Sequence, residues 1–180
     1  MVYTYAECLE KWGSAYQISK AVQRGELYQL EKGVYSDEEY VTTLEIVTKK
    51  YPNAVMTMDT AFYYHGLTDV IPDDYCMATV ESSSAYRDTR IRQMFVREDI
   101  FDYGVITIEH QGVNFKIYDR ERMLIELLRF KNKLPYDYYK EILHNYRDII
   151  HKLDIERIQY YAECFPKSKM ISEALDLEVF

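Results

Sequence analysis

The stretch TYAECLEKWGSAYQISKAVQRGELYQLEKGVYS, residues 4–36, decides how this chain begins to fold. Thr4-Tyr5-Ala6-Glu7 has the spacing of a capping box, in which the threonine oxygen accepts from the Glu7 N–H and the glutamate accepts from the Thr4 N–H. Ser14-Ala15-Tyr16-Gln17 repeats this pattern. Gly13 lies between the two boxes, and glycine closes helices in the left-handed conformation without steric cost. The spacing therefore predicts two short helices that meet at a tight turn.

Apolar residues recur at helical spacing in both predicted helices. They are Tyr5, Cys8, Leu9 and Trp12 in the first, and Ile18, Ala21 and Val22 in the second. Gly25 ends the second helix. Residues 27–31 and 34–35 then flank Lys32-Gly33 and predict a strand, a turn and a strand. Two helices joined by a tight turn are typical of a helix-turn-helix, and the hairpin is a candidate wing.

The second predicted helix has a polar face opposite Ile18. Glutamine pairs bidentately with adenine in the major groove and arginine with guanine, while lysine can contact phosphate. The predicted DNA-contacting residues are Tyr16, Gln17, Lys20, Gln23 and Arg24 on the helix, and Lys32 on the wing. Any small helical pair also has a polar exposed face. The alternative hypothesis is therefore a non-catalytic interaction module that binds a toxin or another protein directly and reads no DNA.

Charge favours the DNA hypothesis only weakly. The chain has a formal net charge of −8, and residues 1–37 carry four cations and five acids. Because phosphate neutralisation supplies most non-specific affinity, we expect weak binding by one copy and a dimer on DNA. Basic residues elsewhere are a second source of charge. Candidates are Arg87, Arg90, Arg92 and Arg97, although charges on a strand edge also serve to prevent sheet pairing.

Composition limits the class of protein. With 180 residues and 48% hydrophobic content, the chain is long enough for a small domain attached to a larger one. Cys8, Cys76 and Cys164 are widely spaced and form no C-x-x-C pair, which argues against a disulfide framework or a zinc ribbon and favours a reducing cytoplasm. No basic-then-apolar leader and no apolar run of membrane-spanning length occur. We expect a cytoplasmic protein with no membrane partner.

A third S-x-x-E pattern, at Ser36-Asp37-Glu38-Glu39, predicts a helix directly after the hairpin. Its expected apolar stripe is Tyr40, Val41, Leu44 and Val47. The domain boundary is accordingly expected after residue 36, with a DNA-binding module over residues 1–36 and an α+β domain over residues 37–180.

Periodicity outlines the rest of the chain. A helix is predicted over residues 58–65, closed by Gly66. Strands are predicted over residues 75–80 and 91–96, and residues 105–109 and 113–118 form a hairpin around His110-Gln111-Gly112. Helical spacing resumes at Asp119 and continues through the stripe at 139–150 and helices at 154–164 and 168–177. The predicted fold class is α+β, with an antiparallel sheet and a helical C-terminus.

Three stretches together resemble the AbiEi-type antitoxin family, which are transcriptional regulators of bacterial abortive-infection toxin–antitoxin systems. The first runs from Ile18-Ser19-Lys20 through Gly25 to Lys32-Gly33-Val34-Tyr35. The second is residues 59–69, DTAFYYHGLTD, followed by Pro72. The third leads from Gly112-Val113 to residues 121–129, ERMLIELLR. Met123 and Glu126 stand where the family usually has threonine and aspartate, and Asp59 stands in place of a serine.

The resemblance implies a winged N-terminal module that represses its own operon at inverted repeats. It also implies a second domain that counters a co-encoded nucleotidyltransferase-like toxin, without requiring a stable complex with that toxin. On this interpretation the chain is an antitoxin and repressor, not an enzyme, and it needs no cofactor.

Two polar groups invite a chemical interpretation. His65 with Asp59, Asp69, Asp73 and Asp74 offers imidazole and carboxylate ligands, which suit divalent metals. No H-x-x-x-H or H-E-x-x-H spacing is present, and a histidine beside a helix-ending glycine is more often structural. We therefore expect no metal site. In the less favoured hypothesis of a metal-dependent nucleic-acid enzyme, Asp59, His65 and Asp69 are the first residues to test.

The second polar group lies in the stretch 121–129. Glu121 and Glu126 with Arg122 and Arg129 have the composition of a catalytic acid and its clamp, but intrahelical ion pairs are the commoner explanation. The chain has no nucleophile elbow, P-loop or glycine-rich dinucleotide turn, and it has only six glycines. No catalytic residue is predicted.

Overall fold

The computed structural model describes residues 1–180 and divides the chain into two units. The first unit comprises residues 1–53 with 109–115, and the second comprises residues 54–108 with 116–180. The first unit runs past the boundary expected after residue 36, because α3 (Thr43–Lys50) packs on β1 (Val2–Thr4) and β3 (Val34–Ser36). Helices and sheets are both present, and the predicted α+β class is confirmed.

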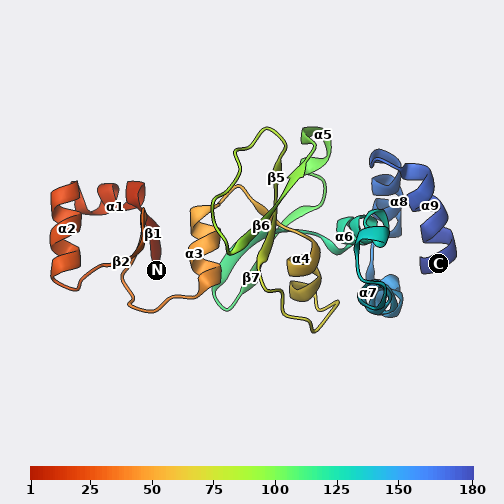
Figure 1. Ribbon diagram of the computed structural model, residues 1–180, viewed down its shortest axis with the longest axis horizontal. Coiled ribbons are helices and arrows are strands. Elements are labelled where there is room, and N and C mark those ends of the chain that lie inside the picture. Colours follow the sequence, from red (N-terminus) through yellow and green to blue (C-terminus); the bar gives the residue numbers. More distant parts are fainter. The chain divides into compact units, whose positions relative to one another are not determined.

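The first unit begins with β1, which leads directly into α1 (Tyr5–Trp12), α2 (Ala15–Gln23), β2 (Tyr28–Glu31) and β3 (Figure 1). The three strands form a sheet in the order β1-β3-β2, and both pairings are antiparallel. No local pattern in the sequence predicts β1. This strand has three residues and depends on β3, which follows it some thirty residues later in the chain, as in the pairing of Tyr3 with Tyr35.

Local signals placed α1 and α2 correctly. The Thr4 capping box forms in both directions, and Gly13 adopts φ 82° with its N–H donating to the Leu9 carbonyl. Ser14 caps α2 by accepting from the Gln17 N–H at 3.3 Å. These contacts involve residues three or four positions apart, which is why sequence alone predicts them.

The third predicted capping box is wrong. Ser36 is buried at the end of β3, where it pairs with Val2 and Tyr28, and its hydroxyl accepts from the Glu38 N–H at 2.9 Å. The helix begins later, because Thr42 and Glu45 form the capping box instead. Of the predicted stripe, Leu44 and Val47 are buried and Val41 is half-buried, but Tyr40 precedes the helix and is 84% exposed.

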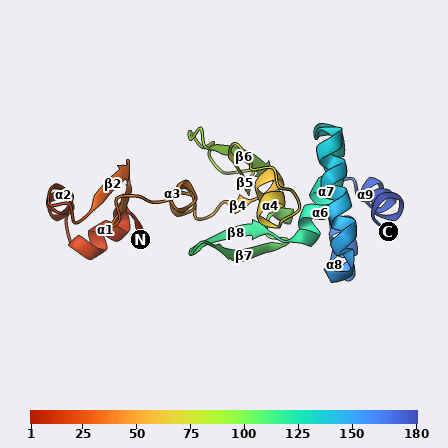
Figure 2. The ribbon, with the colours of Figure 1, turned by 90° about the horizontal axis from the view of Figure 1, so that it is seen from below.

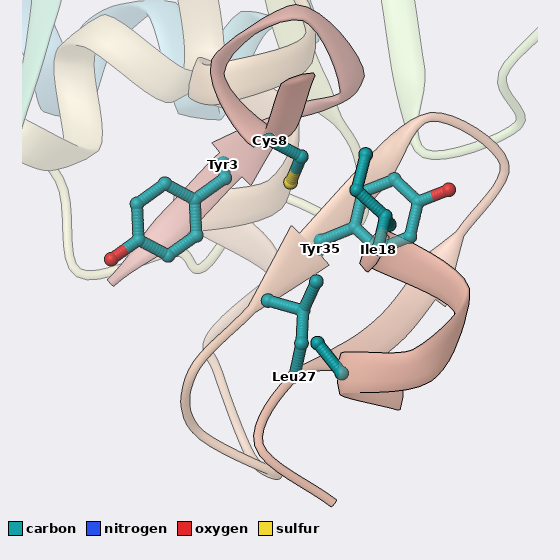
Figure 3. Close-up of a cluster of buried hydrophobic side chains, with 6 residues drawn as sticks. Tyr3, Cys8, Ile18, Leu27 and Tyr35 are labelled. Atoms are coloured by element: carbon teal, nitrogen blue, oxygen red, sulfur yellow. The ribbon is translucent and has the colours of Figure 1, made fainter. Parts of the chain in front are cut away.

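The core of the first unit lies between the two helices and the sheet. Tyr3, Cys8, Ile18, Leu27 and Tyr35 gather there (Figure 3) with Ala21, and Leu9, Trp12 and Val22 pack at the edge. Tyr5, predicted for this core, is instead 42% exposed. The ring of Tyr3 takes the inner position, edge-on to Trp12 at 5.7 Å between ring centres.

The larger sheet has five strands in the order β6-β5-β4-β8-β7. Its strands are β4 (Val55–Met56), β5 (Tyr75–Val80), β6 (Ile91–Val96), β7 (Val105–His110) and β8 (Val113–Tyr118). The predicted antiparallel sheet is wrong in part, because the sheet is mixed: β4 runs antiparallel to β5, but β5 pairs with β6 and β4 pairs with β8 in parallel. Residues 81–90 return the chain from the end of β5 to the level of its first residue, Tyr75, before β6 begins. The two strands can therefore pair in parallel.

The predicted hairpin of β7 and β8 is confirmed (Figure 2). Gln111 and Gly112 have φ values of 52° and 81°, as a tight two-residue hairpin turn requires. On β8, Val113 and Phe115 are buried while Asn114 is exposed, so the alternation predicted from sequence is also found.

Helices make up the rest of the second unit. They are α4 (Met58–Tyr64), α5 (Glu98–Phe101), α6 (Arg120–Arg129), α7 (Tyr136–Ile149), α8 (Ile155–Cys164) and α9 (Ser168–Ala174), with 3₁₀ turns η1 (Lys131–Lys133) and η2 (Ile150–Lys152) and a π-helical turn η3 (Leu175–Val179). α6 packs on α4, α7, α8 and α9, and residues 122–128 are all buried. Figure 2 shows α6 beside α7. No helix combines the length and apolar character needed to cross a membrane.

Candidate nucleic-acid interface

α2 is held in the first unit by its apolar side. Ile18 and Ala21 are 3% and 2% exposed, in contact with the core formed by Cys8 and Leu27. The helix ends where Gly25 adopts φ 72°, and the Glu26 N–H donates back to the Ala21 carbonyl at 3.0 Å. Core packing and this end closure fix which residues of α2 face outward.

The outward side of α2 carries the five helix residues predicted to contact DNA. Tyr16 is 63% exposed, Lys20 is half-buried, and the remaining residues, Gln17, Gln23 and Arg24, are exposed. Lys32 is exposed in the turn between β2 and β3. The structure therefore brings the α2 residues together on one open face, as the helical period predicted.

Two contacts organise the cations on this face. The Lys20 ammonium lies 4.8 Å from the centre of the Tyr16 ring, so the aromatic ring positions a positive charge on the first turns of α2. Arg24 lies 4.0 Å from the Glu26 carboxylate, and both side chains are mostly exposed. An exposed ion pair of this kind contributes about 0–1 kcal/mol, so a phosphate or a guanine edge can compete for the guanidinium.

Lysines from α3 neutralise two acids of the first unit. Lys49 pairs with Glu7 of α1, and Lys50 lies 3.0 Å from Glu31 of β2. Burial alone would raise the pKa of Glu7, but hydrogen bonds from Lys49 and Thr4 outweigh it and leave that pKa lowered. Residues 38–53 add these two lysines but also Glu38, Glu39 and Glu45, so residues 1–53 carry six cations and eight acids and stay net acidic.

Most of the arginines predicted as an auxiliary basic surface pair with acidic side chains. Arg90 binds Asp88, Arg97 pairs with Asp99, and Arg92 pairs with both Asp59 and Asp74. Arg87 is exposed. Three of the four arginines predicted as an auxiliary basic surface thus have acidic partners in the second unit, two of which (Asp59 and Asp74) lie far from Arg92 in the sequence. The stretch forms no continuous basic face.

The residues considered for a metal site do not converge. The His65 Nε2 atom lies 2.7 Å from the Tyr118 carbonyl oxygen, and burial lowers the pKa of this imidazole. Asp59 is taken by Arg92, while Asp69 and Asp73 are exposed. Across residues 1–180, no three histidine, cysteine or carboxylate side chains gather in a way that would hold a metal ion.

Arg122, Glu126 and Arg129 of α6 form a largely buried ionic network, while Glu121 lies outside it and accepts from the Asp154 N–H at 3.0 Å. Arg122 is fully buried and donates to Glu126 from Nε at 3.1 Å and from Nη2 at 2.9 Å. Its Nη1 donates to the carbonyls of Ile100 and Tyr103. Arg129 completes the network from the next turn, 2.8 Å from Glu126. The intrahelical ion pairs expected from the sequence are confirmed.

A groove lined by cations, tyrosine rings and Leu143 lies on the second unit, and the sequence did not predict it. It lies along α7 beside η1 and η3, and its cations and rings are Lys131, Tyr136, Tyr139, Lys140 and Arg147. The α7 members recur three, four and seven positions apart, which is the spacing of one helix face. The sequence predicted only the apolar stripe of this helix, at Tyr139, Ile142, Leu143, Tyr146, Ile149 and Ile150, and not the cations and Tyr136 beside it.

No protein-family model matches this sequence, and no curated protein matches it either.

Proposed function

We propose that residues 1–36 form a winged helix-turn-helix that binds duplex DNA, and that the chain is a transcriptional repressor and antitoxin of the AbiEi type. The observation that carries the proposal is the division of α2 into two sides. Ile18 and Ala21 lie in the core, while Tyr16, Gln17 and Lys20 stand outward with Gln23 and Arg24. A recognition helix needs this combination of a rigid base and free hydrogen-bonding groups.

The order of residues along α2 suggests their roles. In a helix-turn-helix the N-terminal residues of the second helix meet base edges. Gln17 is then the candidate for reading adenine, and Lys20, held beside Tyr16, contacts a guanine edge or a phosphate. Arg24, at the end of α2, is suited to the DNA backbone, and Lys32 in the β2–β3 turn adds a phosphate contact from the wing.

The small number of cations on this surface favours binding by two copies. Lys20, Arg24 and Lys32 offer one module about three phosphate or base contacts, fewer than the six to ten phosphate contacts of strongly salt-dependent binders. A pair of modules on an inverted repeat doubles these contacts. Recognition of such repeats in its own operon is the repressor role that the resemblance to AbiEi-type antitoxins implies.

The proposal is tested on the DNA upstream of the gene, by fluorescence anisotropy at several salt concentrations. The double variant Lys20→Ala, Arg24→Ala is expected to lose about tenfold or more in affinity. Lys169→Ala is the matched control, because Lys169 is 91% exposed in its side chain and belongs to α9 of the second unit, not to α2 or the β2–β3 turn. Equal binding by the double variant and the wild type would refute the surface.

The antitoxin role needs a separate measurement. Co-expression with a nucleotidyltransferase-like toxin from the neighbouring gene is expected to restore growth, and the double variant should still do so while it fails to repress. This separates neutralisation from DNA reading. A tight complex with the toxin, together with no binding to operator DNA, would favour the interaction module over the repressor.

A further inference from the structure

One side of α7 forms a groove with a cavity of about 350 Å³. Tyr136, Tyr139, Lys140 and Arg147 line it from α7, Lys131 lines it from η1, and Glu178 closes it from η3. The three cations outnumber the single acid, on a chain whose formal net charge is −8. The groove therefore attracts anions locally although the protein as a whole repels them.

Aromatic rings alternate with the cations in this groove. The Lys140 ammonium lies 4.6 Å from the centre of the Tyr136 ring, and Tyr136 is 64% exposed. Lys131 lies 5.3 Å from the centre of the Tyr139 ring. An exposed ring beside positive charges is the combination by which proteins hold single-stranded nucleic acids, because bases stack on the ring and cations meet the phosphates.

The groove already holds one anionic group of the protein. The Glu178 carboxylate accepts from Lys131 and from the Tyr139 hydroxyl at 2.8 Å, while Arg147 donates to the Glu178 carbonyl at 2.7 Å. Burial would raise the pKa of Glu178, but the hydrogen bonds from Lys131 and Tyr139 leave it lowered, so the group is charged at neutral pH. The donors needed for an oxyanion are thus in place.

We propose that this groove binds a nucleotide unit, either free or within a single-stranded nucleic acid. The base stacks on Tyr136, the phosphate meets Lys140 together with Lys131 or Arg147, and Glu178 acts as an internal competitor for these cations. The proposal is independent of DNA binding by α2, because it uses only residues of the second unit.

The test uses the full chain carrying Lys20→Ala and Arg24→Ala, so that the proposed duplex-binding surface cannot contribute. Anisotropy of a labelled homopyrimidine oligonucleotide is measured, with AMP and inorganic phosphate as competitors. Tyr136→Ala is expected to weaken binding by about five- to a hundredfold, the usual effect of losing one stacking ring. Lys140→Ala should also weaken it. Glu178→Gln, which removes the competing charge and keeps a hydrogen-bonding amide, should tighten it severalfold.

Tyr160→Ala and Lys169→Ala are the matched controls. Tyr160 is 50% exposed on α8 and Lys169 lies on α9, so neither lines the groove, and binding should be unchanged in both. Competition by AMP supports free nucleotide as the source, and binding of the oligonucleotide without such competition supports nucleic acid. The proposal is overturned if neither the oligonucleotide nor AMP binds. It is also overturned if inorganic phosphate competes as well as AMP and Tyr136→Ala has no effect on binding.

Discussion

The guanidinium of Arg122 lies 4.1 Å from the centre of the Tyr118 ring, and the two side chains are fully buried. The centre of the Phe165 ring lies 4.2 Å from the same guanidinium. Since Glu126 and two backbone carbonyls take up its hydrogen bonds, this buried charge is fully paired. The pair joins the end of β8 to α6, and it connects the sheet of the second unit with its helices.

Replacement of Arg122 tests that connection. Arg122→Met keeps much of the side-chain length but leaves Arg129 as the only ionic partner of Glu126. It also leaves the carbonyls of Ile100 and Tyr103 without the donor that Arg122 provides. We therefore expect a loss of about 3–5 kcal/mol in the free energy of unfolding. Urea denaturation measures it. Arg87→Met, at an exposed position, is the control and should change stability by less than about 0.5 kcal/mol. A loss below about 1 kcal/mol for Arg122→Met would contradict the role given to the network.

The backbone that packs against Arg122 and Asp119 requires a glycine at position 104. Its φ is +75°, and a β-carbon there would lie 2.7 Å from the Arg122 β-carbon and 2.8 Å from the Asp119 carboxylate. Gly104→Ala therefore adds a clash to backbone strain, and we expect it to cost about 3 kcal/mol or more. Gly66→Ala is the matched comparison, because Gly66 has φ +69° but nothing within 4 Å. That variant should lose only about 1 kcal/mol, and equal losses would show that the close contact is unimportant.

The two sides of α2 should respond differently to truncation. Ile18→Ala removes a side chain that is 3% exposed and should cost about 2–5 kcal/mol. Tyr16→Ala, on the outward side, should change stability by less than about 0.5 kcal/mol and lower DNA affinity. Thermal unfolding of both variants and anisotropy of Tyr16→Ala measure these effects. A large stability loss in Tyr16→Ala would mean that α2 is oriented differently.

Salt dependence separates base contacts from phosphate contacts on α2. If Lys20 meets a phosphate, Lys20→Ala should reduce the slope of log affinity against log salt by about one, uniformly across DNA sequences. Gln17→Ala should leave the slope unchanged and relax preference at one base pair by about 1–3 kcal/mol. Titrations on the operator and on a variant with that base pair changed distinguish the two. The roles proposed for the two residues fail if both variants alter the slope equally.

His65 should make stability depend on pH. Burial lowers its pKa below the usual value of 6.5, so below that pH the unfolded chain binds more protons than the folded one. Stability contributed by neutral His65 is therefore present above about pH 6.5 and declines as the pH falls toward the folded pKa. His65→Gln places an amide N–H near the position of the imidazole Nε2, which contacts the Tyr118 carbonyl, and should flatten this decline in urea midpoints. His144→Gln, at a position with a 73% exposed side chain, should not.

Local chemistry was predictable along much of the chain. The boxes at Thr4 and Ser14, the glycine turn at Gly13 and the alternation along β8 all depend on residues a few positions apart. Where two local signals compete, local chemistry alone does not decide. Ser36 and Thr42 are both candidate N-caps. Because Ser36 pairs with β1 and β2, the helix begins after Thr42 instead.

The sequence by itself determined where α1 and α2 begin and end and which side of α2 is polar, because hydrogen bonds and side-chain spacing within one or two turns are encoded locally. Only the tertiary structure decided the partners of each charge and strand. Arg92 meets Asp59 across 33 positions, Lys131 meets Glu178 across 47, and β5 pairs with β6 in parallel. Such contacts form when the core brings distant segments together, and no local pattern specifies them.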